Sequence, residues 1–166
     1  MERRRAPVFL VGFMGAGKTT VGRALARLLD REFVDLDDRI VAEDGRAIAR
    51  ILAESGEPYF RELETRLLAG LRGRPDLVVA CGGGTYANPV SRSVIDGLGT
   101  AVWIQAPLGV MLGRCGGDAG RPLLGTATEA EALYRSRLPA YRTAPVQVDV
   151  EGLTPDEAAV RIAARL

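Results

Sequence analysis

The stretch that most constrains this chain is GFMGAGKTT, which runs from Gly12 to Thr20. Its first eight residues match the pattern GxxxxGK[ST], which requires a strand before it and a helix after it. Val8–Val11 is a short apolar run typical of a buried strand, and a helical pattern runs from Lys18 to Asp30. The match predicts a glycine-rich loop that binds phosphate groups. A plain glycine turn in front of a helix is the alternative interpretation.

Such a loop binds anions because its glycines let the backbone N–H groups point inward, towards the positive end of the helix dipole. We expect Lys18 to reach the β- and γ-phosphates of a nucleotide and Thr19 to ligate Mg²⁺. Lys18 is the only lysine among 22 basic residues, and a compact ammonium suits a tight cradle better than a planar guanidinium. The loop residues expected to contact ATP are Gly12, Met14, Gly15, Ala16, Gly17, Lys18, Thr19 and Thr20.

Composition excludes several classes of function. The chain has no histidine and only two distant cysteines, Cys81 and Cys115, so a Cys/His zinc site and a Ser-His or Cys-His catalytic pair are excluded. A net charge of +1 is too balanced for an electrostatic nucleic-acid binder. Since the only lysine lies in the loop, a guanine-reading NKxD motif is excluded too. No apolar run approaches the length of a membrane span, and we expect a cytoplasmic protein with reduced thiols.

Short apolar runs alternate with longer amphipathic ones, which predicts an α/β fold with a parallel sheet and right-handed crossovers. The strand candidates are Val8–Val11, Phe33–Asp35, Leu77–Cys81, Ala101–Gln105 and Val146–Val150. In the first helix we expect one buried face, made of Val21, Leu25, Leu28 and Leu29. Capping boxes are expected at Thr154–Glu157, with Pro155 at the first helical position, and at Thr128–Glu131.

We expect one domain over residues 1–166, a length that suits a single core. Its core would be residues 1–37, 74–114 and 129–166. Residues 38–73 hold helical patterns without a strand and are expected to form a substrate-binding insertion. Residues 115–128 are rich in glycine and threonine, which is typical of a mobile loop that closes over an active site.

Two aspartates follow a strand candidate in FVDLDD. Alternation along an extended chain would put Asp35 and Asp37 on the same side, at the carboxyl end of the strand, where ligands bind in open α/β sheets. One carboxylate then suits Mg²⁺, and the other suits a substrate hydroxyl whose proton it accepts. The alternative is that these acids only complement the dipole of a following helix, the interpretation we favour for Asp38.

Two further sets of residues are candidates for binding a ligand. Three glycines after the strand candidate Leu77–Cys81 let backbone amides approach a ligand closely, although they also suit a flexible turn. Arginines bind carboxylates and phosphates through two parallel hydrogen bonds, although exposed surface is the ordinary role of most arginines in so arginine-rich a chain. The glycines are Gly82, Gly83 and Gly84, and the arginines are Arg61, Arg121 and Arg137.

Taken in order, these stretches resemble the shikimate kinase family. The motifs that carry the resemblance are GFMGAGKTT, FVDLDDRI, GEPYFRELE, CGGGT, GRPLL and RLPAY, and they span nearly the whole chain. The resemblance implies phosphorylation of the 3-hydroxyl of shikimate by MgATP, on the route to chorismate and the aromatic amino acids. It also implies a three-layer P-loop fold with a five-stranded parallel sheet in the order 2-3-1-4-5, and a monomer.

The resemblance also implies roles for single residues. Lys18 matches the phosphate-binding lysine, and Thr19 and Asp35 match groups at the metal. Asp37 matches the aspartate that binds the substrate hydroxyls and is the candidate base. The residues that match shikimate-binding positions are Arg61 and Arg137, for the carboxylate, and the loop Gly82, Gly83 and Gly84. The residues that match nucleotide-binding positions are Arg121, on the phosphates, and Arg114 and Pro155, on either side of adenine.

The chain departs from the family at Leu52, where an aromatic is common, and at Val41, where glutamate is frequent. Both changes bear on substrate affinity more than on reaction type, and Phe60 remains to form a wall of the pocket. Other small-molecule kinases such as gluconate kinase, a non-catalytic nucleotide-binding protein and a nucleic-acid-dependent ATPase stay as alternatives. The Asp35-Leu36-Asp37 stretch and the glycine loop argue against another small-molecule kinase. Asp37 and Arg121 argue against a non-catalytic protein, and the charge balance argues against a nucleic-acid-dependent ATPase.

Overall fold

The computed structural model describes residues 5–115 and 126–166. Five strands form one parallel sheet in the order β2-β3-β1-β4-β5, which confirms the expected fold class and strand order. Every predicted strand is found, with bounds shifted by one residue at most. The strands are β1 Val8–Val11, β2 Glu32–Asp35, β3 Leu77–Ala80, β4 Thr100–Gln105 and β5 Val146–Asp149.

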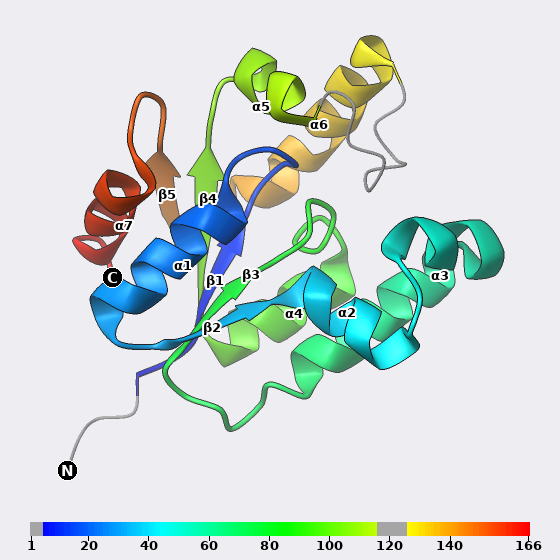
Figure 1. Ribbon diagram of the computed structural model, residues 1–166, viewed down its shortest axis with the longest axis horizontal. Helices are drawn as coiled ribbons and strands as arrows, with labels where there is room; N and C mark the ends of the chain where they lie inside the picture. The colour runs from blue at the N-terminus through cyan, green and yellow to red at the C-terminus, as the bar shows by residue number, and fades with distance from the viewer. Residues whose placement is uncertain (1–4, 116–125) are drawn as a thin grey trace.

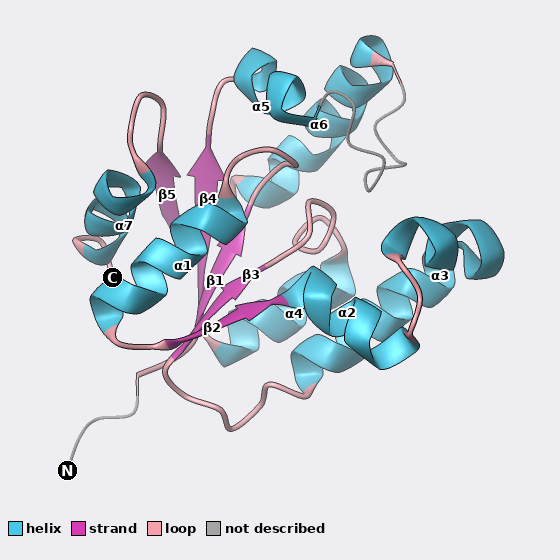
Figure 2. Cartoon of the chain, in the orientation of Figure 1, coloured by secondary structure: helices cyan, strands magenta, loops and turns pink. Residues whose placement is uncertain are grey.

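Helices cover both faces of this sheet (Figure 1). Helix α1 packs against α7 on the near face, and α4 lies behind the sheet and contacts β4. Helices α2 and α3 pack on each other and project beyond the β2 edge, as Figure 2 shows. The helices are α1 Lys18–Leu29, α2 Leu36–Asp44, α3 Ile48–Ala69, α4 Pro89–Leu98, α5 Leu108–Cys115, α6 Ala127–Tyr141 and α7 Pro155–Ala163.

The core is centred on the middle strands. All four residues of β1 and all four of β3 are buried, because helices shield both faces of a parallel sheet. In α1, Val21 and Leu25 join this core as expected, but Leu28 is 50% exposed and the prediction for it was wrong. None of the helices in residues 5–115 and 126–166 is long and apolar enough to cross a membrane.

Residues 38–73 contain helices and no strand, as predicted. Helix α3 is bent at Gly56, whose φ of 84° and ψ of 166° are not helical, and Pro58 follows. Proline lacks the N–H that would bond back across the bend, so the helical hydrogen-bond pattern is interrupted locally, a break that the sequence analysis did not predict. The bend divides α3 into a first part that begins at Ile48 and a second part that carries Arg61.

One capping box was predicted correctly and one wrongly. Thr154 caps α7 with Glu157, and Pro155 is its first residue. The cap of α6 is Thr126 with Glu129, not Thr128 with Glu131, because α6 begins two residues earlier than expected. Both Thr-x-x-Glu pairs satisfy the pattern, so spacing alone cannot choose between them. Helix α5 ends at Cys115, so helical residues occupy both ends of the segment 115–128.

Candidate functional site

The glycine-rich loop joins β1 to α1, as the motif requires. Gly15 has a φ of 78°, and a Cβ atom there would collide with the Met111 carbonyl oxygen, so glycine is required on two grounds. Gly17 is the left-handed N-cap of α1. The Nζ atom of Lys18 donates hydrogen bonds to the carbonyl oxygens of Gly12, at 2.7 Å, and Phe13, at 2.8 Å. These bonds hold the ammonium group inside the curve of the loop.

Asp35 connects this loop to α2. The Thr19 hydroxyl donates to Asp35 Oδ2 at 2.9 Å, while Asp35 Oδ1 accepts from the backbone N–H groups of Asp37 and Asp38. Asp35 is therefore the N-cap of α2, and Asp37 lies in the first turn of that helix. The expected alternation of Asp35 and Asp37 along an extended strand was wrong, because the chain turns into a helix at Leu36.

Thr19 and Asp35 offer two adjacent hard oxygen ligands at the mouth of the loop. Mg²⁺ is usually bound by one or two protein oxygens together with waters and substrate phosphates. The described residues hold no cluster of three or more acidic, cysteine or histidine side chains that would form a closed protein cage. The donor set thus fits a Mg²⁺ ion that is completed by a nucleotide.

The glycine loop after β3 is the meeting point of the site. A Cβ atom on Gly82 would lie 3.1 Å from Asp37 Oδ1. One on Gly83 would lie 3.0 Å from Met14 Cγ, in the phosphate loop, and 3.2 Å from Arg137 Nη1. One on Gly84 would collide with the Arg61 guanidinium and lie 2.9 Å from Arg137 Nη2. Three successive glycines therefore leave room for an aspartate, the phosphate loop and two arginines.

Arg61 is held by acidic neighbours on the second part of α3. Its Nη1 donates to Glu64 Oε1 at 2.9 Å, and its Nε lies 3.5 Å from Glu57 Oε1. Glu64 is fully buried, and its other oxygen accepts from the Thr85 hydroxyl at 2.8 Å. Sequence reasoning gave Glu64 no role, although its i, i+3 spacing from Arg61 is a signal for such a pair.

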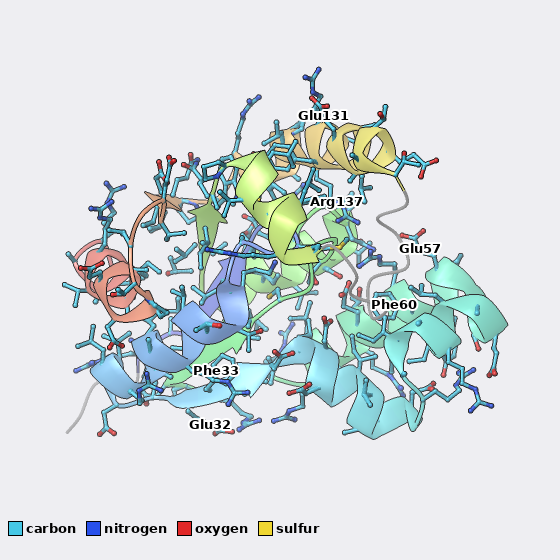
Figure 3. All side chains as sticks on the ribbon, turned by 45° about the horizontal axis from the view of Figure 1, so that its top comes forward. Glu32, Phe33, Glu57, Phe60, Glu131 and Arg137 are labelled. Atoms are coloured by element: carbon cyan, nitrogen blue, oxygen red, sulfur yellow. The ribbon has the colours of Figure 1, made fainter. Side chains whose placement is uncertain are left out.

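Arg137 enters the site from α6, and Figure 3 labels it together with Phe60 of α3. Its side chain is 6% exposed and lies over the Phe13 ring, 5.8 Å from the centroid. Burial lowers the pKa of Arg137, and the nearby positive charge of Arg61 adds to this. Arg137 Nη1 is buried without a hydrogen-bond partner among the described residues. Two converging guanidinium groups with an unused donor make a suitable site for an anion.

A pocket of about 340 Å³ joins these groups. Its walls include most of the predicted site residues and an apolar side made of Ile48, Leu52 and Phe60. Arg114 also lines it and donates to the Gly15 carbonyl at 3.0 Å. Three predicted residues do not line it: Gly12, Ala16 and Pro155. Arg121 lies outside the described residues.

The buried thiol of Cys81 also borders the pocket. Burial, ahead of the negative charge of Glu64, raises the pKa of Cys81, so the thiol stays protonated.

Comparison with known proteins gives a consistent family. The family model described as shikimate kinase matches residues 14–166. The chain is 39% identical to a shikimate kinase of Persephonella marina over 96% of this chain and 98% of that one, and 43% identical to one of Cereibacter sphaeroides over 98% and 83%. The structure of shikimate kinase from Acinetobacter baumannii in complex with shikimate superposes with a TM-score of 0.93 at 36% identity, covering 97% and 92%. A gluconokinase of Sinorhizobium meliloti reaches a TM-score of 0.62 at 18% identity over 99% and 97%, which is a likeness of fold alone.

Proposed function

The chain belongs to the shikimate kinase family, and we propose that its pocket transfers the γ-phosphoryl group of MgATP to the 3-hydroxyl of shikimate. The products are shikimate 3-phosphate and ADP. The observation that carries this proposal is the glycine loop of residues 82–84, because the phosphate loop, Asp37 and the arginine pair all converge on it. A phosphate cradle and a carboxylate clamp that share one small pocket suit a kinase with an acidic acceptor.

On the donor side, the phosphate-loop amides and Lys18 would hold the β- and γ-phosphates. The ammonium group is already held within the loop by the carbonyls of Gly12 and Phe13, which supports this role. Thr19 and Asp35 would hold Mg²⁺, which when bound neutralises charge on the phosphates. These groups fix the nucleotide for in-line transfer, so their contribution is positioning and charge stabilisation.

On the acceptor side, Arg61 and Arg137 would bind the shikimate carboxylate, and Asp37 would orient the 3-hydroxyl. The hydroxyl oxygen attacks the γ-phosphorus as the bond from that phosphorus to the β–γ bridging oxygen breaks. Asp37 accepts the hydroxyl proton, and ADP leaves with the bridging oxygen. The position of Asp37 beside Gly82 supports this assignment, since Gly82 neighbours the phosphate loop through Gly83.

The remaining assignments concern the edges of the pocket. Arg114 beside Gly15 supports a role at the nucleotide end of the site. Pro155 against adenine, Arg121 on the phosphates, closure of residues 115–128 and the monomeric, cytoplasmic state stay predictions. Residues 38–73 would act as the substrate-binding insertion, which agrees with the pocket residues that α3 contributes.

The direct test is coupled ADP release from MgATP with and without shikimate. We expect turnover that requires shikimate and stops when excess EDTA removes Mg²⁺. ADP release that is indifferent to shikimate would contradict the proposal. Gluconate and single-stranded DNA in place of shikimate are the matched controls, since stimulation by either would favour one of the alternative functions.

A further inference from the structure

Tyr141 lies directly beneath the glycine loop. It is the last residue of α6 and is fully buried, with its ring against Trp103 of β4 at a centroid distance of 5.7 Å. Its hydroxyl donates a hydrogen bond to the carbonyl oxygen of Gly83. This phenol joins the end of α6 to the loop on which the two halves of the pocket meet.

The Arg137 guanidinium, one helical turn earlier on α6, lies against the same loop residue, since a Cβ atom on Gly83 would be 3.2 Å from Arg137 Nη1. Arg137 is also packed over the Phe13 ring, so its guanidinium lies between that ring and the glycine loop. Burial raises the pKa of Tyr141 to about 12, so the phenol stays protonated near neutral pH and remains a donor to Gly83. The hydroxyl therefore holds the loop residue against which the Arg137 guanidinium lies.

We propose that Tyr141 is a positioning residue, which sets Gly83 and Arg137 relative to each other through its hydroxyl and so shapes the pocket for the acceptor carboxylate. This inference rests on the proposed function. Tyr141 itself lies behind the loop and does not line the pocket. Its contribution should thus fall on binding of the acid, whereas the nucleotide cradle around Lys18 should be left intact.

The test is Tyr141→Phe, which keeps the ring and removes only the hydroxyl. Tyr86→Phe is the matched control, because Tyr86 is 1% exposed and its hydroxyl donates at 2.8 Å to Asp96, away from the pocket. For Tyr141→Phe we expect the KM for shikimate to rise about tenfold, which is about 1.4 kcal/mol. The KM for ATP should change less than twofold. Tyr86→Phe should leave both KM values unchanged.

A measurement without turnover is also possible, because Trp103 is the only tryptophan of the chain and contacts Tyr141. Titration of its fluorescence with shikimate, in the absence of ATP, should give a Kd that rises with the KM in Tyr141→Phe. Combining Tyr141→Phe with Arg137→Lys gives a double-mutant cycle. Because the hydroxyl is proposed to act partly through Arg137, Tyr141→Phe should weaken shikimate binding less in the Arg137→Lys background than in the wild type.

The proposal is overturned if Tyr141→Phe raises both KM values equally, if it behaves like Tyr86→Phe, or if its effect adds fully to that of Arg137→Lys. Should Tyr141→Phe unfold at the assay temperature, the Kd titration in the cold decides between the same outcomes. Failure of the proposed function would look different, since the wild-type protein would then show no ADP release that depends on shikimate.

Discussion

At the scale of single residues, Gly84 shows how the site depends on a missing side chain. Its backbone is not in the left-handed region, so φ does not require glycine there. Instead, the Arg61 and Arg137 guanidinium groups occupy the space that a Cβ atom would need. Glycine is required here because of its neighbours, and its substitution should displace the Arg61 and Arg137 guanidinium groups without unfolding the chain.

We therefore predict that Gly84→Ala raises the KM for shikimate at least about tenfold, about 1.4 kcal/mol of binding free energy, while the KM for ATP changes little. Steady-state kinetics with each substrate varied in turn measures this. Gly97→Ala is the control, because Gly97 lies in α4 with open space around its Cβ position. That variant should keep both KM values and gain stability of about 0.5–1 kcal/mol from helix propensity. Normal shikimate kinetics in Gly84→Ala would contradict the proposal that Arg61 and Arg137 bind the shikimate carboxylate.

At the scale of elements, a polar cluster fastens the bend of α3 to the end of α2. We define it as Asp44, Arg46, Glu54, Ser55 and Tyr59. Arg46 donates to Asp44, Glu54 and Ser55, and the Tyr59 hydroxyl donates to Asp44 at 2.7 Å. Glu54 and Ser55 precede the bend at Gly56 and Tyr59 follows it, so the cluster spans both parts of the helix.

This cluster predicts a pH dependence of stability. Its hydrogen bond from Arg46, ahead of that from Tyr59, lowers the pKa of Asp44 from 3.8 to about 2. A depressed folded-state pKa means that the stabilisation is complete above about pH 4 and is lost as the pH falls towards 2. Glu54, whose pKa is lowered by Arg50 and then Arg46, acts in the same direction. Urea midpoints of the wild type and Arg46→Gln should therefore differ at neutral pH, draw closer below about pH 4 and converge as the pH approaches about 2.

Arg135→Gln is the control for that experiment. Arg135 pairs with Glu131 on the exposed surface of α6, with the Arg135 side chain 73% exposed, so its loss should matter little at any pH. A gap between the wild type and Arg46→Gln that stayed constant from neutral pH to about pH 2 would show that the Asp44 carboxylate is not the source of the stabilisation.

The same elements show what sequence could predict. Strand and helix positions followed from apolar runs and caps, because each is a local property. The strand order is not a local property, and it came from the family resemblance. Asp37 was assigned correctly to the pocket for a wrong geometric reason, since the N-cap at Asp35 was not recognised. Tyr141 received no role because its hydrogen-bond partner Gly83 is 58 residues away, and no local sequence pattern indicates a contact at that separation.

At the scale of the whole molecule, the fold brings the residues of the two proposed binding sites into one pocket from separate parts of the chain. Lys18 begins α1 after β1, whereas Arg61 lies on α3 beyond the edge of the sheet. Both line the same pocket of about 340 Å³. Because the two residues lie on different elements, a substitution at one should abolish binding of its own ligand without abolishing binding of the other.

Thermal unfolding with each ligand tests this separation. A ligand at about one hundred times its Kd stabilises by about 2.7 kcal/mol, which for a chain of this size is a rise in Tm of about 5–10 °C. We predict that Lys18→Met loses the rise caused by MgATP and keeps that caused by shikimate. Arg61→Ala should show the reverse. Loss of both shifts in either variant, with an unchanged ligand-free Tm, would mean that the pocket is one inseparable site rather than a donor half and an acceptor half. The reciprocal result would assign the ammonium to the nucleotide and the guanidinium to the acid in the absence of turnover, because thermal shifts depend on binding alone.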